Sequence, residues 1–306
     1  MYLKDKTVLI TGNGSFAKTM IERLLTTEVR EVRVFSRNEE NKWKTEKKFA
    51  KDGRVKMILG DITKYLQIYN ACKKVDYVLH SAALKHVKTC EDFPIQAVDT
   101  NVNGSINVMQ ACIENNVERL VCLSTDKSSN ASTCYGSTKY LMERVAKHID
   151  SKNTTIVCTR YGNVLGSSGS VIPLFKQLRE EGKPLTLTDP KMTRFFMPIK
   201  EAIDLVLYAL KEGQNGDIIV HQDKAATVKM IADCISENQV VMGTSQLEKT
   251  DEALLTEQEL NHSLKVGNFY IVRDGAIAEN KFDKPLTSDN AERYDMKELK
   301  ELIDAC

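Results

Sequence analysis

The sequence predicts an α/β protein in which a doubly wound parallel sheet is followed by a smaller second domain. Short apolar runs alternate with amphipathic helical stretches through the first half of the chain, an order typical of βαβ units. These runs are rich in Val, Ile and Leu with little alternation, as expected of strands that helices cover on both faces. After about Gly162 the rhythm changes to Gly-, Ser- and Pro-containing loops and more polar helices.

This pattern assigns the individual elements of the first half. The predicted strands are Thr7–Ile10, Val32–Phe35, Val55–Leu59, Tyr77–His80, Leu120–Leu123 and Thr155–Cys158. The predicted helices between them are Phe16–Leu25, Leu66–Lys73, Ile95–Asn115 and Tyr135–His148.

The second part of the chain is less regular. A Gly/Ser-rich loop at Gly166–Ser170 precedes helical patterns at Val171–Leu178 and Lys200–Lys211. The polar stretch 238–289 has no periodicity that assigns it a structure or a role. No internal repeat or low-complexity linker separates the two parts, so we expect them to pack against each other.

The composition narrows the class of protein. The net charge is +1, from 43 basic and 42 acidic residues. The protein as a whole therefore has no strong electrostatic field that would attract nucleic acid or a membrane surface. The 8 cysteines include no C-x-x-C pair, so we expect no disulfide framework and no metal site, and a reducing compartment. No apolar stretch approaches the roughly 20 residues that span a bilayer, and no signal peptide is expected. A soluble, cytoplasmic protein is predicted.

A glycine-rich turn follows the first strand directly. Residues 11–17 read Thr-Gly-Asn-Gly-Ser-Phe-Ala, a G-x-G-x-x-A pattern between a strand and a helix. Glycines here allow the backbone to approach a pyrophosphate, which lies on the helix N-terminus. This position in the first βαβ unit predicts dinucleotide binding by Gly12, Gly14, Ser15 and Phe16.

The residues at the end of the second strand indicate which dinucleotide the protein binds. An acidic residue there would bind the ribose of NAD, whereas Ser36 and Arg37 suit the 2′-phosphate of NADP. NADP is therefore predicted, with NAD as the alternative if Arg37 is simply a solvated loop residue. Further cofactor contacts are expected from two pairs that follow later strands, Asp61 with Ile62 and Ala82 with Ala83. Residues 1–165 are thus predicted to form an NADP-binding Rossmann-type domain, with later segments returning to it, and 166–306 to be mainly substrate-binding.

Tyr135 and Lys139 are four residues apart, hence on one face of a helix. A neighbouring ammonium lowers the pKa of a phenol, so the tyrosine can take a proton from an alcohol while hydride leaves the same carbon. Thr125, at the end of the preceding strand, can join this proton relay. We expect Tyr135 and Lys139 to contact the cofactor as well.

Asp126 and Lys127 add an acid and a base that oxidation of an alcohol does not need. The alternative is a helix-capping Asp beside a solvated Lys. Their position between an apolar strand and the Tyr135 helix favours catalysis of a further bond-breaking step.

These motifs resemble the extended short-chain dehydrogenase/reductases. Within that group, five segments are similar to the UDP-N-acetylglucosamine 4,6-dehydratases: Ala83–Val87, Ser124–Lys127, Arg160–Gly166, Gly169–Phe175 and Met192–Phe195. Later segments, from Glu201–Val206 to Glu252–Leu255, resemble the 5-inverting members that serve capsule and O-antigen synthesis.

The resemblance implies an internal redox cycle on one sugar nucleotide. Tyr135 would deprotonate the 4-hydroxyl as hydride passes to NADP, Lys127 would remove H5, and Asp126 would protonate the departing 6-hydroxyl. The cofactor would stay tightly bound and be recycled, and relatives self-associate, so a homo-oligomer from dimer to hexamer is implied. The implied substrate contacts are Lys85, Asn163, Val171, Pro173 and Arg194.

Two departures leave alternatives open. The glycine loop is a residue shorter than the family's usual one, and Tyr135 stands where inverting members often carry Met. A retaining 4,6-dehydratase, a nucleotide-sugar 4-epimerase or reductase, and a non-enzymatic NADP sensor therefore remain as rival hypotheses.

Overall fold

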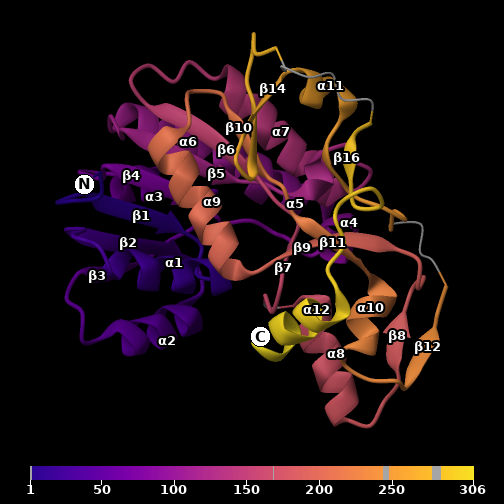
Figure 1. Ribbon diagram of the computed structural model, residues 1–306. Coiled ribbons are helices and arrows are strands. Elements are labelled where there is room, and N and C mark those ends of the chain that lie inside the picture. Colours follow the sequence, from indigo (N-terminus) through magenta and orange to yellow (C-terminus); the bar gives the residue numbers. More distant parts are fainter. Residues whose placement is uncertain (1, 168, 244–247, 278–283) are drawn as a thin grey trace.

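The computed structural model describes residues 2–167, 169–243, 248–277 and 284–306 and confirms the predicted α/β fold. Within these residues the centre is a nine-stranded sheet in the order β14-β15-β10-β6-β5-β4-β1-β2-β3 (Figure 1). The parallel strands are β1 (Thr7–Thr11), β2 (Glu31–Ser36), β3 (Val55–Leu59), β4 (Tyr77–His80), β5 (Arg119–Leu123), β6 (Thr155–Arg160) and β10 (Ile218–His221). At one edge, β15 (Phe269–Val272) pairs antiparallel with β10, and β14 (Ser263–Val266) pairs antiparallel with β15. The sheet is therefore mixed.

The six predicted strands are confirmed, and the central ones are buried on both faces, whereas the edge strand β3 has no buried residue. Every residue of β1 and of β4 is buried. Leu9 packs in one core cluster, whereas Val8 and Ile10 pack in another. Successive side chains of a strand point to opposite faces, so these clusters lie on the two sides of the sheet.

Helices cover both clusters. Helices α1 (Ser15–Leu25) and α9 (Ile199–Glu212) pack with Val8 and Ile10. Helices α3 (Tyr65–Ala71), α6 (Gly104–Glu114) and α7 (Cys134–His148) pack with Leu9. The sequence pattern did not predict α2 (Glu39–Phe49), in which only Thr45 is buried, because such a helix has no apolar stripe.

The helix predicted at Ile95–Asn115 is divided into three pieces. Helix α5 (Pro94–Ala97) follows α4 (Val87–Asp92) and leads into a π-helical segment, Val98–Asn103, before α6 begins. Segments of π-helix are frequent at functional sites.

The smaller sheets lie outside the main one. One has three strands in the order β11 (Lys224–Thr227), β9 (Thr193–Met197) and β7 (Asn163–Val164). Two others have two strands each: β12 (Gln239–Val241) with β8 (Leu185–Leu187), and β13 (Ala253–Leu255) with β16 (Leu286–Thr287). Helices α8 (Val171–Glu180), α10 (Val228–Asp233) and α12 (Met296–Asp304) share a core cluster of their own and gather at one end of the molecule (Figure 1). Ser168 of the predicted Gly/Ser-rich loop lies outside the described residues.

A buried arginine connects the C-terminal part to the main sheet. Arg160, at the end of β6, donates to Glu143 Oε2 of α7 at 2.7 Å and to Glu259 Oε1 of α11 (Glu257–Asn261) at 3.0 Å. It also donates to the Leu254 carbonyl in β13 at 2.9 Å. The side chains of Arg160 and Glu143 are each 1% exposed, so this network fixes β13 against the helix that bears Tyr135.

Candidate active site

The glycine loop has the geometry of an anion site. Gly12 has φ +90°, and an added Cβ would lie 3.0 Å from Ser81 Oγ, so a side chain is strained and crowded there. Gly14 is the N-cap of α1, has open space where a Cβ would stand, and provides no side-chain cap. The buried Asn13 Nδ2 has no hydrogen-bond partner. The backbone amides of the first turn of α1 and this orphaned donor fit a pyrophosphate at the N-terminus of the helix.

Two of the predicted cofactor residues, Arg37 and Asp61, border a cavity of about 610 Å³. Arg37 lies 3.6 Å from Asp61 (Nη1 to Oδ2) and is 56% exposed. Ser36 Oγ accepts from the Asn38 amide at 3.3 Å. The cavity combines a guanidinium with a carboxylate, as expected for a ligand that has both a phosphate and an adenine amino group. Ile62 is buried beside Gly104, where a Cβ would overlap its side chain.

The segment after β4 is held by a residue that sequence reasoning did not select. Asn101, in the π-helical segment, accepts from the Leu84 amide at 2.8 Å and donates to the Leu84 carbonyl at 2.9 Å. It also donates to Thr138 Oγ1 of α7 at 3.0 Å. Ala82 donates its amide to Thr11 Oγ1 at 3.3 Å. Asn101 therefore positions the chain that follows Ala82 and Ala83 against α7.

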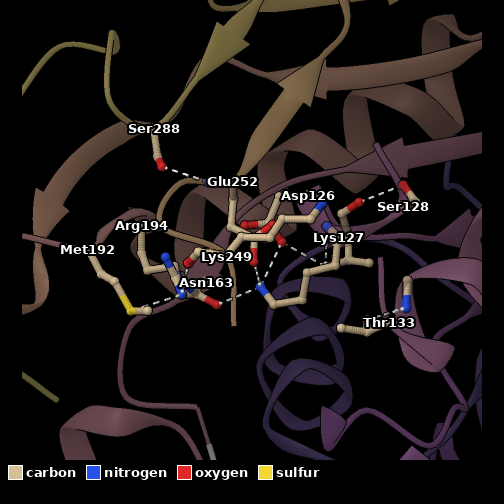
Figure 2. A network of polar contacts seen from close by, with 12 residues as sticks. Asp126, Lys127, Ser128, Thr133, Asn163, Met192, Arg194, Lys249, Glu252 and Ser288 are labelled. Carbon is tan, nitrogen blue, oxygen red and sulfur yellow. Dashed lines mark hydrogen bonds and ion pairs between the residues drawn. The ribbon is translucent and has the colours of Figure 1, made fainter. Parts of the chain in front are cut away.

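Helix α7 approaches the Asp126–Ser128 3₁₀ turn closely. A Cβ on Gly136 would overlap the Lys127 carbonyl oxygen, so only glycine allows this packing. Thr133 caps the helix by accepting from the Gly136 amide at 3.1 Å (Figure 2). As a result, Tyr135 lies buried beside the end of β5, where Thr125 and Asp126 follow.

The pKa of Tyr135 depends on burial and on the groups around the phenol. Burial raises the pKa of Tyr135 to about 12, while the Lys127 charge and the nearby Thr125 hydroxyl lower it. The Lys139 ammonium, which was also expected to lower this pKa, donates to the Leu123 carbonyl at 2.7 Å. Burial lowers the pKa of Lys139 itself. Lys127 is therefore a cation that favours the phenolate and that the sequence prediction did not assign to this role.

Asp126 and Lys127 belong to a buried ionic cluster with a third member, Glu252 (Figure 2). Lys127 Nζ lies 3.0 Å from Asp126 Oδ1, 3.5 Å from Asn163 Oδ1 and 3.7 Å from Glu252 Oε1. Asp126 is 0% exposed and Glu252 5%. Asp126 Oδ2 and Glu252 Oε2 are buried without a hydrogen-bond partner. One lysine is thus shared by two carboxylates, each with a free oxygen.

The two carboxylates control the charge of this lysine. Burial lowers the pKa of Lys127, but the charges of Asp126 and Glu252 outweigh it and raise that pKa. Burial raises the pKa of Glu252, against the opposing charge of Lys127. Lys127 is consequently an ammonium at neutral pH and must lose a proton before it acts as a base.

The predicted substrate residues are not all brought to the cluster. Asn163 contacts Lys127 as described, and Arg194 borders a cavity of about 120 Å³ together with Lys127 and Glu252. The Arg194 guanidinium, predicted to pair a phosphate, donates to the carbonyls of Thr193, Lys249 and Thr250. Val171 and Pro173 lie in the first turn of α8, and Lys85 is an exposed residue just before α4.

The described residues form neither a metal site nor a helix that could span a membrane. Among those residues, no group of three or more His, Cys, Asp and Glu side chains could hold a metal ion. In the same part of the chain, no helix has the length and apolar character needed to cross a membrane.

The comparisons with known proteins agree with this architecture. The family model described as polysaccharide biosynthesis protein matches residues 8–274. A protein named UDP-glucose 4-epimerase from Rickettsia typhi (strain ATCC VR-144 / Wilmington) is 39% identical over 326 residues, covering 98% of this chain and 95% of that protein. The X-ray structure of Pen from Bacillus thuringiensis superposes with a TM-score of 0.94 at 31% identity, covering 100% of this chain and 98% of the other.

A more distant structure shares the fold. DesIV from Streptomyces venezuelae, a dTDP-glucose 4,6-dehydratase solved with NAD bound, gives a TM-score of 0.72 at 20% identity over 80% of this chain and 86% of that one. At this identity the likeness concerns the fold alone. The chain therefore belongs to the polysaccharide biosynthesis protein family and has the Rossmann-like fold of extended short-chain epimerases and dehydratases.

Proposed function

We propose that the protein is a UDP-N-acetylglucosamine 4,6-dehydratase that uses a recycled NADP and inverts C5. The observation that carries this proposal is the cluster of Asp126, Lys127 and Glu252 beside the Thr125–Tyr135 pair. Oxidation at C4 needs only the Thr125, Tyr135 and Lys139 groups, whereas loss of water also needs an acid and a base. A cytoplasmic location and assembly as a homo-oligomer stay predictions.

The residues of the cofactor site fit a nicotinamide dinucleotide, as the crowded Gly12 and the orphaned Asn13 Nδ2 indicate. When bound, this group supplies reversible hydride transfer, outward from C4 and later back to C6. Gly12, Gly14 and Ser15 would hold the pyrophosphate, and Arg37 a 2′-phosphate. Tyr135, paired with Thr125, would take the proton of the 4-hydroxyl.

The cluster would then carry out the elimination. A 4-ketone acidifies H5, which neutral Lys127 removes. Asp126, once protonated, donates to O6 as the C6–O6 bond breaks and water leaves. Both carboxylates of the cluster are placed to relieve Lys127 of its proton beforehand, because each has an oxygen within 3.7 Å of Nζ.

A 4-epimerase is the second candidate, and the name of the relative from Rickettsia typhi favours it. An epimerase oxidises and reduces C4 without breaking the C6–O6 bond. Asp126 and Lys127 would then be dispensable for chemistry, and no water would be lost.

One experiment separates these candidates. The protein is incubated with UDP-N-acetylglucosamine in D₂O, and the product is followed by NMR beside an active reference dehydratase. We expect a 6-deoxy-4-keto sugar with deuterium at C5, and its ring couplings report the C5 configuration. A C4 epimer that keeps its 6-hydroxyl would establish the epimerase instead, and unchanged substrate would rule out both.

The rate of C4 oxidation is expected to rise with pH above neutrality. The reactive form of Tyr135 is the phenolate, and burial raises the pKa of Tyr135 to about 12. The Lys127 charge lowers this pKa, so Lys127→Met should move the rising limb to higher pH. Nicotinamide reduction in a single turnover, measured across pH, checks both statements. If the rising part of the pH–rate profile lies at the same pH in Lys127→Met as in the wild type, the Lys127 charge does not lower the pKa of Tyr135 as assigned.

Replacing Arg37 with Ala is expected to weaken NADP binding about tenfold while NAD binding stays unchanged. A charged hydrogen bond to phosphate contributes about 1.5–3 kcal/mol, and the exposure of Arg37 reduces this. Calorimetric titration with each dinucleotide measures the effect. Lys64→Ala, a change in the same cavity, is the control and should affect both dinucleotides alike. If Arg37→Ala lowers the affinity for NADP and for NAD equally, Arg37 does not select the cofactor.

A further inference from the structure

The Arg194 guanidinium holds the backbone of a segment that lies 55 residues further along the chain. Its Nη1 donates to the Thr193 carbonyl at 2.7 Å and to the Thr250 carbonyl at 3.1 Å. Its Nη2 donates to the Lys249 carbonyl at 2.9 Å and to Met192 Sδ at 3.7 Å (Figure 2). Each Nη has two N–H groups, so these contacts occupy all four of them. A bidentate pairing with a phosphate would have to break at least one.

Two further residues hold the same segment, which consists of residues 249–252. Thr193, on β9, donates its hydroxyl to Asp251 Oδ1 at 2.6 Å. Ser288 Oγ accepts from the Glu252 amide at 2.9 Å and donates to the Thr193 carbonyl at 3.0 Å. The Ser288 amide donates to the Glu252 carbonyl at 2.8 Å. The backbone of the 249–252 segment is thus fixed by β9 and by Ser288 together.

The position of the Glu252 carboxylate depends on the backbone that bears it. Glu252 Oε1 lies 3.7 Å from Lys127 Nζ, beyond the length of about 2.7–3.2 Å that is usual for an N–H···O hydrogen bond. Glu252 Oε2 is buried and has no hydrogen-bond partner. A displacement of about 1 Å away from Lys127 would take this carboxylate out of range for proton transfer, and such displacements can cost on the order of 10²-fold in rate.

We propose that Arg194 is a positioning residue for the elimination step, which fixes the 249–252 segment so that Glu252 stays beside Lys127, and that it does not pair a substrate phosphate. The effect on elimination rests on the proposed function. The hold of Arg194 on the segment, which we call the Arg194 clasp, does not.

Glu252 matters to elimination because it is the carboxylate that is free to accept a proton. Asp126 has to keep a proton of its own for O6. Glu252 Oε1 can therefore take the proton from Lys127 Nζ, which leaves Lys127 as a neutral amine and Glu252 as a carboxylic acid when H5 is removed. If the Arg194 clasp opens, Lys127 stays an ammonium more of the time and elimination slows, whereas oxidation at C4 does not use Glu252.

The first test is Arg194→Lys, which keeps a positive charge in the small cavity that Arg194 shares with Lys127 and Glu252 but lacks the planar fork. We expect the 6-deoxy-4-keto product to form more slowly by on the order of 10²-fold, as NMR measures. Nicotinamide reduction in a single turnover should stay near the wild-type rate. A lysine can still pair a phosphate as a point charge, so a role in phosphate binding predicts elimination close to the wild-type rate.

Three further variants make the assignment specific. Ser288→Ala should also slow elimination, and Ser288 is 0% exposed, so it does not touch the substrate. The double variant Arg194→Lys, Glu252→Gln should be no slower than Glu252→Gln alone, because both changes act through one carboxylate. Lys191→Met, at an exposed cation just before β9, is the matched control and should behave as the wild type.

Two measurements on Arg194→Met test the Arg194 clasp without the reaction. Calorimetric titration of the cofactor-loaded protein with UDP should give the wild-type affinity, whereas loss of a phosphate contact would weaken binding about tenfold or more. Hydrogen exchange, followed by mass spectrometry, should be faster in peptides that contain residues 249–252, because their backbone is released. The urea unfolding midpoint shows whether each variant is folded.

Elimination at the wild-type rate in Arg194→Lys would overturn the proposal, as would weakened UDP binding with unchanged exchange in Arg194→Met. If Arg194→Met does not fold, Arg194→Lys and Ser288→Ala decide, and wild-type elimination in both would contradict the proposed role. A wild type that returns a C4 epimer would refute the dehydratase function instead. In that case UDP affinity and hydrogen exchange still decide whether Arg194 holds the segment or a phosphate.

Discussion

Lys127→Ala is expected to abolish loss of water while binding of the dinucleotide stays near the wild-type level. Lys127 lies in the cluster with Asp126 and Glu252, whereas the predicted pyrophosphate site is formed by Gly12 and Gly14. Loss of a positioned general base costs about 10²–10⁴-fold in rate. NMR detection of the 6-deoxy-4-keto product and calorimetric titration with the cofactor measure the two effects.

Lys249→Ala is the matched control for this change. Lys249 borders the same small cavity, but its ammonium donates to the Asn130 carbonyl and not to the cluster. We expect this variant to keep the capacity to eliminate water. If cofactor binding collapses in Lys127→Ala, the role of Lys127 is structural, since removal of its charge would then have disturbed the fold around two buried carboxylates.

Arg160→Met is expected to lower the free energy of unfolding by about 3–5 kcal/mol, the usual cost of leaving a buried ion pair without one partner. Arg160 is 1% exposed and donates to Glu143, to Glu259 and to the Leu254 carbonyl. Without it, the Ser128 hydroxyl, at 2.7 Å, would be the one hydrogen-bond partner left to the Glu143 carboxylate among the described residues. The midpoint and slope of urea unfolding measure the loss.

The control is Arg23→Met at a surface ion pair. Arg23 lies 3.8 Å from Asp204 (Nη2 to Oδ1), and both side chains are about half exposed, at 54% and 49%. Such pairs contribute at most about 1 kcal/mol. An Arg160→Met protein as stable as Arg23→Met would show that water or another side chain satisfies Glu143 and Glu259, and that β13 is held by other contacts.

Much of the fold could be predicted from the sequence because strands buried on both faces have an unmistakable composition. Tyr77–His80, for example, is a short and mainly apolar run, and the structure buries all four of its residues. Helix α2 was missed because nearly every residue of Glu39–Phe49 faces solvent, so no periodic apolar stripe was available. The antiparallel strands β14 and β15 were missed for a different reason: Phe269–Val272 is a short apolar run with three buried residues, but it lies within the stretch 238–289, which is polar on average.

The candidate site was predictable only where local spacing fixes geometry. Tyr135 and Lys139 share one face of α7, and Thr125 and Asp126 follow β5 directly. Glu252 could not be found in this way, because it is more than 100 residues from Asp126 along the chain and meets the cluster through β13. Asn101 could not be selected from local spacing either, because its contacts with Leu84 and Thr138 depend on the π-helical turn.

The sequence by itself determined the α/β architecture, the dinucleotide loop and the identity of the groups available for chemistry, because periodicity and spacing are local properties. Only the tertiary structure decided which charges those groups experience. It placed Lys127 where its charge lowers the pKa of Tyr135, and it brought Glu252 to within 3.7 Å of Lys127. Burial and through-space charge determine pKa values, and both depend on residues that are distant in the chain.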